Sequence, residues 1–266
     1  MKLFHRKYGS GPPLIIAHGL YGSSDNWVTV ARLLSPYFSV WLIDQRNHGN
    51  SPHSPEHTYE VMKNDLLEFM DEQNLSQAIL IGHSMGGKTV MYFAKDYPER
   101  VSALIVVDIL PIAYPANSFN SLEHLHIIAS LLSVSLYDVS NRREAEQKFM
   151  EYIGDRRTVK FLLKNLYRTK EGRYEWKINL TAIRDNLPEL LSGFDIRKFN
   201  AVNNITGFPI LFVRGSKSKH IPVESFSEIK KIFPYAEIVT IPDAGHWLHA
   251  EKPELFVKNI LYFLGL

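Results

Sequence analysis

A glycine-rich stretch at residues 82–89 constrains this chain more than any other segment, because it fits two different chemistries. It follows the apolar run 78–81 and precedes a helix-like segment. Read as G-x-S-x-G, it puts Ser84 in the sharp strand-to-helix turn that lifts a nucleophilic hydroxyl above a parallel sheet. Read as G-x-x-x-x-G-K-T, it is a phosphate-binding loop in which Lys88 and Thr89 contact phosphate and Mg²⁺. The remaining segments must discriminate between the two.

The composition indicates a globular protein that binds neither nucleic acid nor a membrane. With 266 residues, 45% of them hydrophobic, the chain can bury one substantial core. A formal net charge of +2 gives no support for nucleic-acid binding. Without cysteine there can be no disulfide, thiolate metal site or cysteine nucleophile. The sequence shows no signal-peptide or transmembrane stretch, so we expect a cytoplasmic protein without membrane insertion.

Apolar strand-like runs alternate with helix-like segments in both outer parts of the chain. The expected strands are residues 14–17, 40–43, 79–81, 103–107, 210–213 and 236–241. The expected helices between and after them are residues 25–34, 59–73, 84–96, 223–233 and 253–264. Continuous apolar strands joined by helices predict an α/β fold, with a mostly parallel central sheet that is covered by helices on both faces.

A mostly helical stretch interrupts this alternation. It is expected to contain helices at 122–132, 141–153, 158–167 and 180–191, the last broken near Pro188. We therefore predict a core domain made of residues 1–110 and 208–266, and a helical cap formed by residues 111–207 that is inserted between two strands. The cap would cover the carboxyl edge of the sheet, where open α/β sheets bind their ligands.

Two further segments favour the serine interpretation. His18 and Gly19 follow the first buried strand, and a loop at that place can supply a backbone N–H to a developing oxyanion. We expect the oxyanion donors to be the N–H groups of Leu20 and of Met85, the residue after the serine. His246 lies in a Gly-His-Trp turn after the last strand, where a general base can approach Ser84.

The acidic partner of the histidine is not where such a residue usually lies. The loop after the next-to-last strand, residues 215–220, holds no carboxylate, and Ser218 occupies the expected place. Asp108 ends the strand that follows the helix after Ser84, and strands joined by a short crossover usually lie side by side. Asp108 can therefore reach His246, and an imidazole is a suitable partner for a carboxylate at the end of an apolar strand.

The phosphate-loop interpretation explains less of the sequence. It leaves His18-Gly19, residues 44–51 and His246-Trp247 without a role. In the serine interpretation Gly82 and Gly86 flank the nucleophile because side chains would clash in the sharp turn. Lys88 and Thr89 are then expected to be ordinary residues of the following helix.

Four motifs together resemble the α/β-hydrolase superfamily, and within it the small bacterial esterases of the YbfF type and their mitochondrial relatives. The motifs lie at residues 18–23, 44–51, 82–88 and 245–253. The more specific points are the sequence Arg46-Asn47-His48-Gly49, the sequence Val107-Asp108-Ile109 and the missing acid near Ser218. The resemblance covers nearly the whole chain, though the cap matches least. It implies hydrolysis of esters and acyl-CoA thioesters, with Asp108 as the acid of a Ser-His-Asp triad.

The predicted substrate is a small ester or thioester, and the sequence shows no metal or cofactor site. His124 and His126 are two residues apart on a helix and face different ways. Residues 141–200 carry 14 Lys and Arg against 9 Asp and Glu, so a basic cap could attract an anionic leaving group; a solvated helix surface is the alternative explanation.

Two other functions stay open from the sequence. One is a same-fold enzyme with different chemistry, such as a carbon–carbon hydrolase, a lyase or a perhydrolase. The other is a ligand-binding protein with a nearly silent triad. Oligomeric state and acyl-chain length are not encoded in any motif.

Overall fold

A computed structural model describes residues 1–266 and shows a twisted seven-stranded sheet in the order β1-β3-β2-β4-β5-β8-β9. The strands are β1 (His5–Tyr8), β2 (Pro13–Ala17), β3 (Ser39–Ile43), β4 (Ala78–His83), β5 (Val101–Val107), β8 (Ile210–Gly215) and β9 (Glu237–Ile241). All neighbours are parallel except β1, which is antiparallel to β3. The predicted mostly parallel sheet is therefore confirmed.

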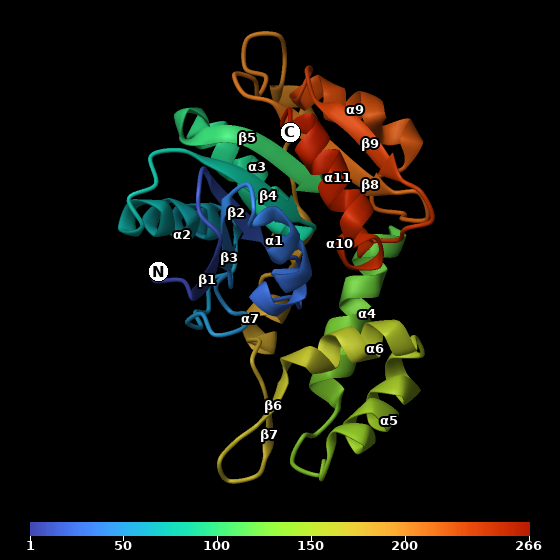
Figure 1. Cartoon of the computed structure of the whole chain (residues 1–266). Helices are drawn as coiled ribbons and strands as arrows, with labels where there is room; N and C mark the ends of the chain where they lie inside the picture. Colours follow the sequence, from blue (N-terminus) through green and yellow to red (C-terminus); the bar gives the residue numbers. More distant parts are fainter.

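Helices cover both faces of this sheet (Figure 1). One face carries α1 (Val28–Leu34), preceded by η1 (Ser24–Trp27), and α11 (Pro253–Phe263), preceded by α10 (Leu248–Glu251). The other carries α2 (Tyr59–Glu72), α3 (Met85–Asp96) and α9 (Phe226–Ile232), with η2 (Pro98–Arg100) and η5 (Val223–Ser225) beside them. Alternate strand residues enter the two cores: Ile15 packs toward α2 and α3, and Ile16 toward α1 and α11. This is the expected pattern for strands buried on both faces.

The insert, which we define as residues 111–207 between β5 and β8, lies below the sheet in Figure 1 over its elements from α4 to β7, whereas its last residues return to the sheet beside α9. Its elements are α4 (Phe119–Ser133), α5 (Arg142–Ile153), α6 (Arg156–Leu162), η3 (Leu163–Asn165), β6 (Leu166–Arg168), β7 (Tyr174–Trp176), α7 (Leu180–Asp185), α8 (Leu187–Leu191) and η4 (Ile196–Lys198). All of these except η4 enclose a separate apolar core that also contains Leu20 and Met85. The residues around η4 pack instead in the core beside α9. The division into a core domain and a cap stays a prediction.

The predicted helix over residues 158–167 is wrong at its end. Helix α6 stops at Leu162, and Leu166–Arg168 pair with Tyr174–Trp176 as an antiparallel hairpin. The Asn165 side chain donates to the carbonyl of Tyr21 at 2.7 Å, which fixes the chain as it leaves the helix. Aromatic residues in both strands favour a sheet over a helix here. The predicted break near Pro188 is present, since α7 ends at Asp185 and α8 begins at Leu187.

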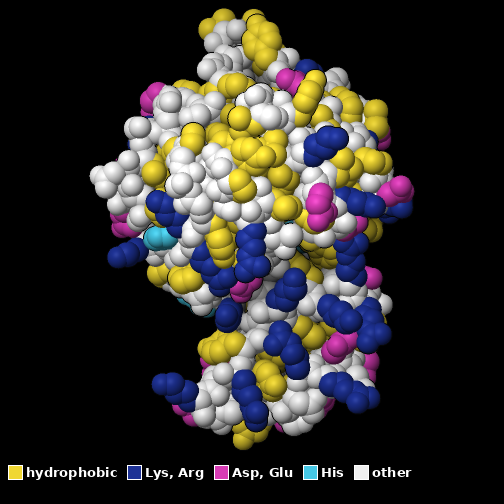
Figure 2. Space-filling model, viewed as in Figure 1, with side chains coloured by type: hydrophobic (Ala, Val, Ile, Leu, Met, Phe, Trp, Pro, Cys, Tyr) yellow, Lys and Arg dark blue, Asp and Glu magenta, His cyan; other side chains and the backbone are white.

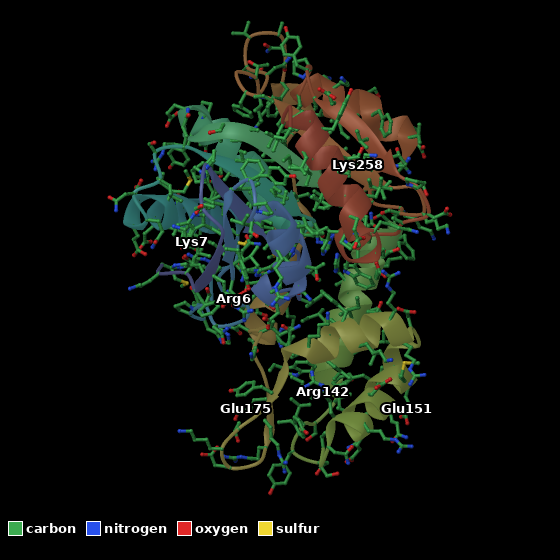
Figure 3. All side chains as sticks on the ribbon, viewed as in Figure 1. Arg6, Lys7, Arg142, Glu151, Glu175 and Lys258 are labelled. Carbon is green, nitrogen blue, oxygen red and sulfur yellow. The ribbon has the colours of Figure 1, made fainter.

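Polar contacts hold the insert together and attach it to the sheet. Arg142 lies among the elements of the insert (Figure 3), where its guanidinium donates to the carbonyls of Leu163 and Leu166. At the base of the insert, Ile112 forms a parallel bridge with Phe194. The two connections to the sheet therefore run side by side.

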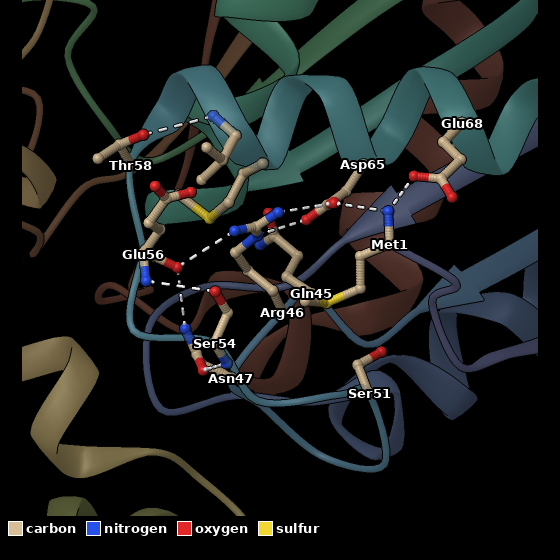
Figure 4. Close-up of polar contacts among 12 residues, drawn as sticks. Met1, Gln45, Arg46, Asn47, Ser51, Ser54, Glu56, Thr58, Asp65 and Glu68 are labelled. Carbon is tan, nitrogen blue, oxygen red and sulfur yellow. Dashed lines mark hydrogen bonds and ion pairs between the residues drawn. The ribbon is translucent and has the colours of Figure 1, made fainter.

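A second network fixes the loop that follows β3 (Figure 4). Arg46 binds Asp65 of α2 through two hydrogen bonds, one of them 2.8 Å long, and also donates to the Glu56 carbonyl at 3.2 Å. Asn47 accepts from the backbone of Ser54 at 2.8 Å. Arg46 and Asp65 are both buried, so the pair depends on these contacts for its stability.

Positively charged side chains are distributed unevenly over the surface. On the face shown in Figure 2, Lys and Arg side chains gather over the insert and along its junction with the sheet half. No helix in the structure combines the length and the apolarity that crossing a bilayer requires.

Candidate active site

Ser84 occupies a strained turn between β4 and α3. Its backbone has φ 52° and ψ −120°, a conformation that non-glycine residues rarely adopt. A Cβ atom at Gly82 would lie 2.2 Å from the Gly86 carbonyl oxygen, and one at Gly86 would lie 2.3 Å from the Ala17 carbonyl oxygen. Both glycines of the motif are therefore required by close backbone contacts, and the turn presents Ser84 at the carboxyl end of the sheet.

The loop after β2 lies directly against Ser84. Strands β2 and β4 are neighbours, and β3 lies on the other side of β2, so the strand order reverses here. Such reversal points are where open α/β sheets bind ligands. A Cβ atom at Gly19 would lie only 3.1 Å from the Ser84 Cβ atom. The turn at Gly19 thus approaches the serine as closely as a backbone can.

The two predicted oxyanion donors lie on either side of this contact. The N–H groups of Leu20 and Met85 donate to no loop or turn carbonyl and to no side chain of the protein. Met85 is the first residue of α3, and a first-turn N–H has no acceptor within its own helix. Both groups are thus free to bind an oxygen beside Ser84.

Asp108 and His246 come together although they are 138 residues apart in the sequence. His246 Nδ1 lies 2.8 Å from Asp108 Oδ2. Asp108 is fully buried at the end of β5, where it accepts from the Gly215 N–H at 3.1 Å and from the Ser218 hydroxyl. His246 and Ser84 line the same cavity, without a hydrogen bond between them. In ligand-free sites such serine–histidine contacts are often long.

Burial controls the protonation of this pair. Desolvation raises the pKa of Asp108 to about 6, while His220, the Ser218 hydroxyl and the Gly215 N–H oppose the rise. Desolvation also lowers the pKa of His246 below that of a free imidazole. At neutral pH the site therefore holds a carboxylate beside a neutral imidazole, which can accept a proton from a neighbouring hydroxyl.

We expect the acidic limb of the kcat/KM profile to lie near pH 6, because Asp108 takes up a proton there and no longer stabilises a charged imidazole. The Ser218→Ala variant removes a donor that favours the ionised carboxylate, so its pKa should rise and the limb should move to higher pH. Ester hydrolysis measured from pH 4.5 to 8.5 checks this. A limb at the same pH in both proteins would show that Asp108 does not control it.

The residues of the alternative phosphate loop are engaged in other contacts. Lys88 is only 1% exposed, and its ammonium donates to the carbonyls of Ile112, at 3.0 Å, and Ser192. Thr89 donates to the Gln45 side chain at 2.8 Å. Lys88 lies on α3 as expected, but it is not an ordinary helix residue, because its buried ammonium joins α3 to the insert at Ile112 and Ser192. Neither residue faces a phosphate-sized site, so the serine interpretation is favoured.

Two cavities meet at Ser84. The larger has a volume of about 370 Å³ and is lined by His246, Tyr21, Phe161 and Trp247, and by charged residues at its rim. The smaller, of about 20 Å³, lies beneath α4 and α8. Leu20, Met85, Ile109, Leu187 and Leu190 line it together with Ser84.

Sequence reasoning gave no role to three side chains of the site. His220 stacks on His246, with ring centroids 3.6 Å apart and an interplanar angle of 19°. His124 and Asn120 of α4 line the small cavity beside Ser84. The position of His220 two residues after Ser218 could have drawn attention to it. Nothing in the sequence shows that α4 turns His124 toward the serine, because that depends on how the insert folds.

Three comparisons with known proteins show what this chain is similar to. Residues 12–253 match the model of a family described as alpha/beta hydrolase fold. The chain is 32% identical over 253 residues to esterase YbfF of Escherichia coli, covering 95% of this chain and 93% of that protein. It is 38% identical over 261 residues to the sn-1-specific diacylglycerol lipase ABHD11 of Danio rerio, covering 96% and 79%. A solved structure named Marine microorganism esterase superposes with a TM-score of 0.94 at 46% identity, covering 98% and 99% of the two chains.

Proposed function

The chain belongs to the α/β-hydrolase family and is a hydrolase enzyme, and on this premise we propose that it cleaves carboxylic esters through an acyl-enzyme formed on Ser84. The observation that carries the proposal is the convergence of three residues from distant parts of the chain. Ser84 is held in a strained turn, in a cavity that it shares with His246, and His246 is bonded to the buried carboxylate of Asp108. These are the parts that nucleophilic acyl transfer requires.

The mechanism follows from the position of each group. His246 takes the proton from Ser84 as the hydroxyl attacks the acyl carbon, and Asp108 stabilises the imidazolium that forms. The N–H groups of Leu20 and Met85 hold the oxyanion of the tetrahedral intermediate. His246 then protonates the leaving alcohol, and the acyl group stays on Ser84. A water molecule, activated by His246, attacks the acyl-enzyme and releases the acid through the reverse sequence.

We further propose that the insert acts as a cap that receives the leaving group, thioesters included. A hollow of about 190 Å³ beside the larger cavity is lined by Arg157, Lys160 and Lys164, with no acidic side chain among its lining residues. Arg157 lies 5.0 Å over the Trp247 ring, and both residues line the two spaces. An anionic leaving group could extend past Trp247 to these cations. Arg157 is also paired with Glu251, at 2.6 Å, and Arg156 is paired with Glu146. Lys160 and Lys164 are therefore the cations of this hollow that have no acidic partner.

The proposed function is tested with a fluorophosphonate probe, which reacts covalently with activated serines. The wild-type protein should be labelled and should hydrolyse p-nitrophenyl esters, whereas the folded Ser84→Ala protein should do neither. Acyl-CoA thioesters in the same panel measure the preference for thioesters. A folded wild-type protein that neither reacts with the probe nor turns over esters would favour a ligand-binding role. The expected cytoplasmic location stays a prediction.

A further inference from the structure

Three polar side chains in the small cavity have atoms without a hydrogen-bond partner in the protein. They are Asn120 at Oδ1, His124 at Nδ1 and His220 at Nδ1, each of them buried. Asn120 and His220 are each 5% exposed. A buried polar atom without a partner costs about 1–3 kcal/mol. Three such atoms around one nucleophile therefore require a physical explanation.

Other polar groups at the edge of this cavity are satisfied. The Tyr59 hydroxyl donates to the Leu190 carbonyl at 2.6 Å. The Tyr114 hydroxyl donates to the His220 carbonyl at 2.8 Å and accepts from the Leu110 N–H at 3.1 Å. The unpartnered atoms are thus confined to some of the polar side chains of this region; of those that line the larger cavity, the Tyr21 hydroxyl also lacks a partner. They belong to the side chains that line the space next to Ser84.

The small cavity lies on the acyl side of the serine. Met85 lines only the small cavity and His246 only the larger one, whereas Ser84 lies between them and lines both. Leu20, His124 and His220 also line both cavities. His246 lines the larger cavity and must protonate the leaving group, so the leaving group belongs there. The acyl chain is left with a space of about 20 Å³. A cavity holds one water molecule when the volume open to the centre of that molecule is roughly 10–15 Å³. The small cavity is little larger than this, so only a very short acyl chain fits.

The polar groups in this cavity carry no charge at neutral pH. Burial, assisted by nearby Lys88, lowers the pKa of His124 to about 4. Burial and His246 lower the pKa of His220 well below its usual value. Lys88 itself is engaged by the Ile112 and Ser192 carbonyls. Neutral imidazoles and an amide can both donate and accept hydrogen bonds. A hydroxyl, which does the same, matches them, whereas a carboxylate would lack a cationic partner.

Resting on the proposed esterase function, we propose that Asn120, His124 and His220 form a recognition site for a short hydroxyacyl group. Leu20, Ile109 and Leu187 contact its carbon atoms, and the three polar side chains bind its hydroxyl. A site built to hydrogen-bond a hydroxyl discriminates strongly against an analogue without one, because its own polar groups are then left unpaired.

The test compares ethyl glycolate with ethyl propionate, whose acyl groups differ by a hydroxyl in place of a methyl. The intrinsic reactivities of the two esters differ, so the measured quantity is the change in the ratio of their kcat/KM values between proteins. Asn120→Leu and His124→Phe should each lower the glycolate-to-propionate ratio by about tenfold or more, through loss of glycolate turnover. His220 stays intact, so the stack on His246 is not disturbed.

The matched control is His126→Phe, which changes an exposed residue of the same helix. The glycolate-to-propionate ratio of kcat/KM should be the same in this variant as in wild type. Unchanged ratios in Asn120→Leu and His124→Phe, with propionate turnover intact, would overturn the hydroxyacyl site while leaving the esterase function in place. If wild type hydrolyses p-nitrophenyl esters but neither of these two esters, the hydroxyacyl site is overturned; if it hydrolyses no ester at all, the proposed function itself fails.

A second measurement uses the wild-type enzyme alone and does not depend on the folding of any variant. Glycolamide and propionamide, as neutral product analogues, compete with a chromogenic ester. Glycolamide should inhibit at a concentration about tenfold lower than propionamide, because only its hydroxyl meets the unpaired groups. Equal inhibition by the two amides would overturn the proposal.

Discussion

Ser84→Ala is expected to lower kcat for ester hydrolysis by on the order of 10⁴ or more, because the acyl-enzyme route disappears with the hydroxyl. Ser218 is the other serine that lines the larger cavity, and its hydroxyl is already engaged by Asp108. It cannot take over the attack without giving up that bond. Steady-state kinetics with p-nitrophenyl acetate, together with an unfolding curve for each protein, check the prediction.

A second variant separates loss of the nucleophile from loss of the fold. At φ 52° and ψ −120°, position 84 suits glycine better than any residue with a Cβ atom. Ser84→Gly should therefore be at least as stable as Ser84→Ala and equally inactive. Residual turnover near the wild-type level in either folded variant would remove Ser84 from the mechanism. A stable Ser84→Ala protein with a much less stable Ser84→Gly would contradict the strain attributed to this turn.

Much of the fold follows from local patterns in the sequence. The strands of the sheet core are continuous apolar runs, because they are buried on both faces and need no alternation. The turn at Ser84 could also be predicted from the sequence. Its glycines are required by close contacts with residues that are near in sequence or on the neighbouring strand. In contrast, β1 has the sequence HRKY and lies half-exposed at the edge of the sheet, so it carries no apolar signal.

What could not be predicted depends on contacts between distant segments. The β6–β7 hairpin replaces the end of a predicted helix where Asn165 bonds to Tyr21, a contact across 144 residues. Lys88 was expected to be an ordinary helix residue because only the folded insert provides the carbonyls that bind its ammonium. His124 joins the small cavity for the same reason. The contact between Asp108 and His246 could be predicted from the sequence, because sheet topology restricts which strand ends can lie side by side.

Asp108→Asn should lower kcat by on the order of 10⁴, and this variant bears most directly on the unusual place of the acid. Asparagine keeps the shape of the side chain, but its amide can donate a hydrogen bond to His246 Nδ1 and so favour the wrong imidazole tautomer. The matched control is Glu123→Gln, which removes another carboxylate lining the same cavity and should change kcat by less than about threefold. An Asp108→Asn protein with wild-type turnover would assign the acid role to a different carboxylate.

A rescue experiment then tests whether the carboxylate must come from the end of β5, or whether a carboxylate from another segment at the same place can replace it. The Ser218 hydroxyl contacts the same Oδ2 atom of Asp108 that binds His246. A carboxylate at position 218 would therefore lie within reach of the imidazole from the loop after β8. Adding Ser218→Asp to Asp108→Asn should recover at least about tenfold of the lost kcat, since the correct tautomer is restored. No recovery in a folded double variant would mean that the buried strand end holds the carboxylate in an orientation that the loop cannot reproduce.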